Sequence, residues 1–198
     1  MIYSLSAKIS ERLTSIGYVD PDETETVAYG FFTMLSKIIY ALIAFSLGAL
    51  MGRLPESMVF YFSVLFIRKY SGSFHADTEG RCFVISSLSI ACSICLLALS
   101  CLYTEAAAAL IILSAVSGVA IVWLSPVPAI EKPLDERETA RFRRNARIRF
   151  AVLSVLVIAA GFTPFKSYCY AGLSAIALVG TFLAIGKVKV NFVLNHRT

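Results

Sequence analysis

Residues 68–82 have the sequence RKYSGSFHADTEGRC and form the one polar island in the first half of a very apolar chain. Long hydrophobic runs lie on both sides of the island, so we expect apolar helices that are joined there. Gly72 and Gly80, with the serine, aspartate and threonine residues around them, favour a reversal of the chain direction. The island also holds His75, one of only two histidines, and it ends in Cys82.

His75 and Cys82 have the residue types of a general base and a nucleophile. They are seven positions apart, so on a continuous helix they would lie about 10 Å apart along the axis, whereas proton transfer requires heavy atoms about 3 Å apart. We therefore expect His75 on a loop or short helix that folds back onto the start of the next helix. Cys82 would then lie in the first turn of that helix, where free backbone N–H groups, the helix dipole and the nearby Arg68 and Arg81 favour a thiolate. The alternative is that Cys82 is only a packing residue, and spacing alone does not separate the two interpretations.

Composition indicates an integral membrane protein. Hydrophobic residues make up 58% of the 198 residues and the mean hydropathy is +0.75, which exceeds what a soluble domain of this length needs. Basic residues at the cytoplasmic ends of membrane helices explain the net charge of +5, so we expect no nucleic-acid partner. The five cysteines are scattered over predicted membrane segments and indicate reduced thiols. We expect neither a metal nor a cofactor.

The hydrophobic pattern predicts an all-α, polytopic membrane fold that forms a single membrane domain over residues 1–198. An amphipathic helix at residues 1–18 has its apolar side chains at intervals of three and four, which suits a helix on the membrane surface. Segment 54–69 is short, so it is either a full span with charged ends that reach the interface or a partly re-entrant helix. The membrane segments, about six in all, are predicted at 27–50, 54–69, 82–102, 106–124, 150–165 and 168–186, with a basic cytoplasmic loop at 126–149.

The distribution of lysine and arginine predicts the orientation of these segments. With six spans, most of the basic residues fall in alternate connections, and those connections include both termini, the loop of His75 and the loop at 126–149. Basic residues accumulate on the cytoplasmic side of a membrane. We therefore expect a multi-pass protein with both termini and the candidate catalytic loop in the cytoplasm.

The polar island resembles the core motif of the AgrB family, the accessory gene regulator B membrane endopeptidases of Gram-positive bacteria. The likeness covers most of the chain, and the combination of an arginine, a histidine and a cysteine is fairly specific. The residues that carry it are Arg68, the turn at Gly72, His75-Ala76 and Cys82, together with Tyr29-Gly30 and Pro126-Val127-Pro128.

The resemblance implies a cysteine endopeptidase in the bacterial cell membrane, acting on an AgrD-like propeptide and assembled as a homodimer. Such an enzyme cuts off the carboxyl-terminal tail of the propeptide through a thioester on Cys82, and it promotes closure of a thiolactone or lactone ring in a quorum-sensing peptide. His75 would take the thiol proton. Arg68 is the candidate for holding the substrate or stabilising the oxyanion, and Asp77 or Glu79 for orienting the imidazole.

The resemblance also suggests a role for the basic stretch after Pro126. The tail of an AgrD-like propeptide is acidic, so arginines beside the membrane would attract it electrostatically. The candidates for binding this tail are Arg141, Arg143, Arg144 and Arg147.

Two other functions remain open at this stage. In a small polytopic transporter, Lys37 and His75 would mark an ion or substrate path. In a membrane thiol oxidoreductase, Cys92 and Cys95 would form a redox pair, although their position inside a predicted span argues against it.

Overall fold

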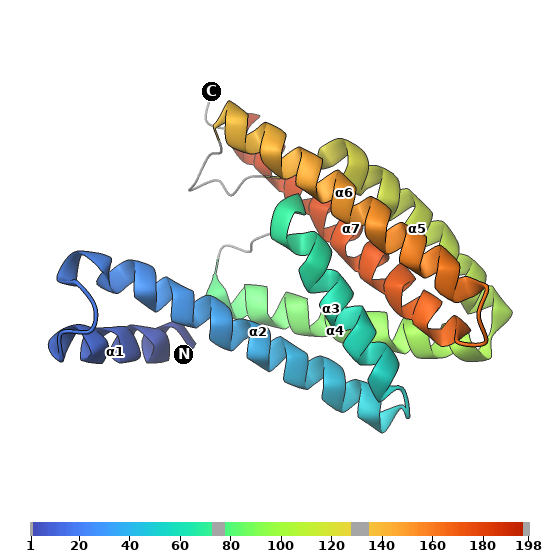
Figure 1. Ribbon diagram of the computed structural model, residues 1–198, viewed down its shortest axis with the longest axis horizontal. Helices are drawn as coiled ribbons and strands as arrows, with labels where there is room; N and C mark the ends of the chain where they lie inside the picture. Colours follow the sequence, from blue (N-terminus) through green and yellow to red (C-terminus); the bar gives the residue numbers. More distant parts are fainter. Residues whose placement is uncertain (1, 73–77, 128–134, 196–198) are drawn as a thin grey trace. The chain divides into compact units, whose positions relative to one another are not determined.

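The part of the protein that the structure describes is mainly helical. The computed structural model describes residues 2–72, 78–127 and 135–195, which form seven α-helices and one short 3-10 helix (Figure 1). The chain divides into two compact units, residues 1–43 and 44–198. The helices are α1 (Ile2–Ser15), η1 (Pro21–Glu23), α2 (Thr24–Leu50), α3 (Leu54–Ser71), α4 (Glu79–Leu102), α5 (Thr104–Leu124), α6 (Glu136–Gly161) and α7 (Lys166–Asn195).

The predicted class of helical membrane protein is confirmed. Within the described ranges, four helical stretches are long and apolar enough to cross a membrane, by length and composition: Pro21–Leu50, Gly80–Leu102, Thr104–Leu124 and Lys166–Phe192. The short segment after Arg53 is one continuous helix, α3, of 18 residues. At 1.5 Å per residue its length is about 27 Å, close to the ~30 Å of a hydrocarbon core.

The first unit contains α1, η1 and most of α2. The hydroxyl group of Ser10 donates a hydrogen bond of 2.6 Å to the carbonyl oxygen of Thr24, and the hydroxyl groups of Thr14 and Thr24 lie 2.9 Å apart. Further along, the rings of Tyr3 and Phe32 meet edge to face with centroids 5.9 Å apart. Contacts at both ends of α1, in reverse sequence order, show that α1 runs antiparallel to the start of α2.

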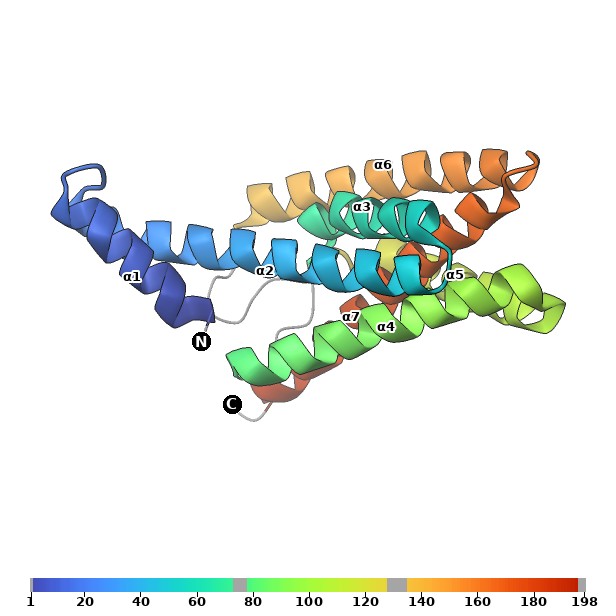
Figure 2. The same cartoon turned by 90° about the horizontal axis from the view of Figure 1, so that it is seen from below.

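In the second unit α7 is the central helix. It packs against α3, α4, α5 and α6, and 67% of its membrane-length window is buried, compared with 33% for α5 and 22% for α4. Figure 2 shows α3 and α6 on the same side of this unit. Small residues bring α7 close to its neighbours: a side chain at Gly180 would meet the backbone of Ser117, and a side chain at Gly172 would meet Val157. Close helix contact at small residues is typical of membrane bundles.

The stretch 126–149, which was predicted as a basic loop, is helical in its second half. Helix α6 begins at Glu136 and continues without a break to Gly161. The reason is local: Asp135 and Glu138 form a capping box at its start, and the residues from 136 to 160 include no glycine or proline that would end a helix. The arginines of this stretch therefore lie on the first turns of a helix whose later turns are apolar.

Candidate functional site

Cys82 lies in the first turns of α4. Thr78 caps this helix, because its hydroxyl oxygen accepts a hydrogen bond of 3.3 Å from the backbone N–H of Arg81 and its carbonyl oxygen accepts one of 3.0 Å from that of Cys82. The thiol is free and half-buried. Helical geometry leaves the backbone N–H groups of Glu79 and Gly80 without an intrahelical acceptor, so unused donors and the positive end of the helix dipole lie within one turn of the sulfur-bearing residue.

Arg68 lies in the last turn of α3, directly before the polar island. Its side chain is half-buried and lines a narrow cleft between α3 and α7. The other residues that line this cleft are Val64 and Gly72 from the α3 side, and Leu178, Val179 and Phe182 from α7. An arginine here has its charge beside the point where the candidate catalytic loop leaves the helix.

At Gly72 the chain leaves α3 against another segment. The backbone N–H of Val127 donates a hydrogen bond of 3.1 Å to the carbonyl oxygen of Ser71, and Gly72 and Val127 form a parallel β-bridge. Gly72 has a φ of +80°. A Cβ at this position would overlap the carbonyl oxygen of Val127 and lie 3.0 Å from its nitrogen. Both the backbone conformation and the close approach therefore require glycine.

A second attachment holds the last turns of α3 against α6. Arg149 of α6 donates a hydrogen bond of 2.8 Å to the carbonyl oxygen of Phe66. Its guanidinium carbon lies 4.8 Å from the ring centroid of Phe66 and 4.3 Å from that of Tyr70. Phe142, also on α6, meets the Tyr70 ring edge to face at 5.4 Å. These contacts could not be predicted from the sequence, since no local pattern links residues so far apart along the chain.

Part of the predicted site lies outside the described residues. The residues His75 and Asp77 are outside the described part. The side chain of Glu79 is outside it as well, although the backbone of Glu79 begins α4. Six peptide steps separate Gly72 from Thr78, so the connection between the end of α3 and the cap of α4 can span at most about 20 Å. The pairing of His75 with Cys82 therefore stays a prediction.

The four arginines predicted to bind an acidic tail fall into two pairs on α6. The Nε atoms of Arg143 and Arg147 donate hydrogen bonds of 3.3 and 3.2 Å to the carbonyl oxygens of Ser125 and Val122, at the end of α5. Arg141 and Arg144 are exposed. Neither has a hydrogen bond or ion pair with another residue of the described part. One pair thus binds the preceding segment through Nε, and the other pair faces outward.

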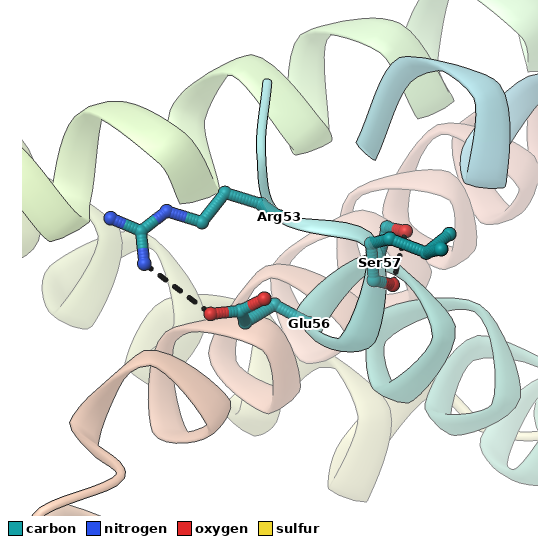
Figure 3. Close-up of polar contacts among 4 residues, drawn as sticks. Arg53, Glu56 and Ser57 are labelled. Atoms are coloured by element: carbon teal, nitrogen blue, oxygen red, sulfur yellow. Dashed lines mark hydrogen bonds and ion pairs between the residues drawn. The ribbon is translucent and has the colours of Figure 1, made fainter. Parts of the chain in front are cut away.

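A separate polar cluster lies at the other end of α3. Arg53 pairs with Glu56 at 3.3 Å, and the hydroxyl group of Ser57 donates a hydrogen bond of 2.8 Å to the carbonyl oxygen of Leu54 (Figure 3). Glu56 is only 7% exposed. Each group of this cluster has its partner within residues 53–57, so the cluster is a local feature of the start of α3. Among the described residues, no group of three histidine, cysteine, aspartate or glutamate side chains could hold a metal ion.

Comparison with known proteins gives the family. The sequence model of accessory gene regulator B, AgrB, matches residues 4–185. The chain is also 32% identical over 96 residues to an AgrB-like protein of Clostridium perfringens strain SM101, and 29% identical over 96 residues to a second AgrB-like protein from strain 13 of that species. Each alignment covers 48% of this chain and 44% of the relative, so the chain matches less than half the length of these curated relatives. No solved structure matches the chain. Since the family match extends over nearly all of the sequence, the chain belongs to the accessory gene regulator B family.

Proposed function

We propose that this protein is a membrane-embedded cysteine endopeptidase that removes the carboxyl-terminal tail of an AgrD-like propeptide and closes a thiolactone or lactone ring in what remains. The observation that carries the proposal is the position of Cys82. It is a half-buried free thiol at the start of α4, at the end of the short loop that contains His75. A thiol beside a helix amino terminus, with a histidine within reach of the same loop, has the composition of a cysteine protease site.

The first step forms a thioester. The imidazole of His75 takes the thiol proton of Cys82, and the sulfur adds to the carbonyl carbon of the scissile peptide bond. The tetrahedral intermediate then breaks its C–N bond, and the imidazolium returns the proton to the leaving amine. The tail departs with a free amino terminus, and the rest of the propeptide stays bound to the Cys82 sulfur as an acyl group.

The second step closes the ring. A thiol or hydroxyl group of the bound peptide gives its proton to His75 and attacks the thioester carbonyl. The C–S bond to Cys82 breaks, and the imidazolium proton restores the thiol. Exchange with a thiol is nearly balanced in energy, whereas hydrolysis is strongly downhill, so the ring forms in good yield only where water is kept out.

Charge stabilisation in both steps is assigned to groups around the loop. The backbone N–H groups of Glu79 and Gly80 and the guanidinium of Arg68 are the donors proposed for the developing oxyanion. Asp77 or the side chain of Glu79 orients the imidazole. Arg68 suits this role because it lines the cleft beside Gly72, at the other side of the same loop from Cys82.

Substrate recruitment is assigned to α6. The acidic tail is attracted to Arg141, Arg143, Arg144 and Arg147, which lie on the first turns of this helix. The predominance of basic residues on alternate segments supports a cytoplasmic position for these arginines, for both termini and for the catalytic loop. The protein acts in the bacterial cell membrane, and the family supports assembly as a homodimer.

The test is to incubate the purified full chain in liposomes with a synthetic propeptide and to analyse the products by mass spectrometry. We expect an acyl adduct on Cys82, a released tail and a cyclic product. Cys82→Ser should abolish all three, while Cys101→Ser, which changes another free thiol, should leave them intact. Processing by Cys82→Ser at the unaltered rate would refute the protease mechanism, and the transporter alternative would then be preferred.

A further inference from the structure

The segment that follows α5 has a feature that the proposed chemistry does not use. Ser125 and Val127 are 1% and 4% exposed although they lie outside any helix. Buried backbone outside regular structure must find hydrogen-bond partners, and within a membrane such backbone is tolerated only where protein buries it or it lines a cavity. The partner here is the end of α3: Val127 donates to Ser71 and bridges to Gly72.

The same segment is held on its other side by α6. Arg143 donates to the carbonyl oxygen of Ser125 at 3.3 Å, and one helical turn later Arg147 donates to that of Val122 at 3.2 Å. These carbonyl groups belong to the end of α5, where the last turn of a helix lacks intrahelical donors. The two arginines therefore satisfy the end of α5 and fix the short segment that continues from it.

The consequence lies at Gly72, the last described residue before the His75 loop. Its carbonyl side is where the loop begins, and His75 follows three positions later. Because Gly72 is paired with Val127 in a conformation that only glycine adopts readily, the segment after α5 holds the end of α3, and α6 holds that segment through Arg143.

We propose that Ser125–Val127, anchored by Arg143, is a positioning element that fixes the starting point of the catalytic loop and so places His75 against Cys82. This inference rests on the proposed protease function. Arg143 and Val127 are positioning residues under this proposal and touch no reacting atom. Arg143 then acts on the rate of the chemical step as well as on attraction of the acidic tail, whereas the outward-facing Arg144 acts only on that attraction.

The test compares Arg143→Gln with Arg144→Gln in the full chain, reconstituted in liposomes with the same synthetic propeptide. Both variants lose one positive charge from neighbouring positions of the same helix. Single-turnover formation of the Cys82 adduct is measured over a range of propeptide concentrations, which separates the saturating rate from the half-saturating concentration. A misplacement of about 1 Å at a reacting group lowers a rate about 100-fold, so we expect Arg143→Gln to lower the saturating rate by about tenfold or more. Arg144→Gln should raise the half-saturating concentration and leave the saturating rate unchanged.

Two further measurements protect the result. Arg143→Lys keeps the charge and a donor, so it should recover part of the saturating rate. The pH profile of Cys82 alkylation by iodoacetamide should shift in Arg143→Gln and stay as in the wild type in Arg144→Gln.

Gly72→Ala disrupts the pairing of Gly72 with Val127 from the side of α3, and it should lower the saturating rate more strongly. Its control is Gly161→Ala, because a Cβ there meets only the Cys169 sulfur at 3.6 Å.

The outcomes are distinct from those that test the protease itself. If the wild type forms no adduct on Cys82, the proposed function fails and the positioning role fails with it. If the wild type forms the adduct and Arg143→Gln changes only the half-saturating concentration, as Arg144→Gln does, the positioning role is overturned while the protease stands. If Gly72→Ala does not fold, the comparison of Arg143→Gln with Arg144→Gln decides whether the positioning role holds, because the side chains of Arg143 and Arg144 are exposed.

Discussion

Replacing Arg149 by methionine removes the side chain that fastens the end of α3 to α6. The lost interactions are a hydrogen bond from a charged donor to the Phe66 carbonyl at 2.8 Å and two cation–π contacts, with Phe66 and Tyr70. A charged hydrogen bond contributes about 1.5–3 kcal/mol, and each exposed cation–π contact about 0.5–1 kcal/mol. These contributions overlap, and methionine keeps the contact of the aliphatic stem. We therefore expect a loss of about 2 kcal/mol in the local stability of the last turns of α3.

Hydrogen–deuterium exchange in nanodiscs measures this quantity directly. Local opening exposes amides in proportion to its equilibrium constant, and since 1.4 kcal/mol is a factor of ten, a loss of 2 kcal/mol accelerates exchange about 30-fold. The acceleration should be confined to peptides that cover the end of α3, from Phe66 to Gly72. Arg149→Lys keeps a cation over the two rings but loses the planar fork, so its exchange rate should lie between those of the wild type and the methionine variant.

The control is Arg144→Met, which makes the same change at an exposed position of the same helix, where no hydrogen bond, ion pair or cation–π contact with another described residue is lost. Equal exchange at the end of α3 in Arg149→Met and Arg144→Met would refute the reasoning, because it would mean that the guanidinium between the two rings contributes nothing to holding the helices together.

Two predictions concern the stability of the bundle. Gly180→Ala should lower the free energy of unfolding by about 1–3 kcal/mol, since a Cβ would lie 2.6 Å from the Cα of Ser117; the unfolding temperature in detergent checks this against Gly161→Ala, and equal temperatures would contradict it. Glu56→Gln should destabilise the start of α3 by about 1–3 kcal/mol because it leaves the Arg53 guanidinium without its carboxylate. Replacing Arg53 by methionine in the Glu56→Gln background should restore part of the lost unfolding temperature, and a further decrease would show that the ion pair is not the cause.

The helical membrane class followed from composition and hydrophobic runs, and helix α3 shows where such runs are insufficient. Its apolar core is short, so hydropathy left open whether it was a full helix or a re-entrant segment. The structure gives one helix from Leu54 to Ser71. Its last turns are held by contacts with distant residues, among them the hydrogen bond from Arg149 to the Phe66 carbonyl oxygen, and a window of local hydropathy does not detect such contacts.

In helix α6 the first turns are polar rather than apolar, and local helix signals predict the structure better than polarity does. The arginines between 137 and 149 were predicted as part of a cytoplasmic loop, where a helix with a basic face beside the membrane suits their order, and Asp135 and Glu138 supply the signals for a helix start. The capping box and the lack of helix breakers outweigh polarity, because charge alone does not prevent a helix from forming. Because neighbouring side chains on a helix point in different directions, the arginines of α6 do not all have the same surroundings.

The sequence by itself determined the class of fold, the family, and the residue types that the proposed chemistry needs, because apolar composition and a motif of nearby residues are local properties of the chain. Only the tertiary structure decided that Val127 pairs with Ser71 and Gly72, and that Arg143 and Arg147 turn toward the end of α5 while Arg141 and Arg144 face outward. These contacts join residues that are far apart along the chain, and their geometry depends on how the helices pack against α7. A pattern of hydrophobicity and charge does not encode that packing in a form that can be read locally.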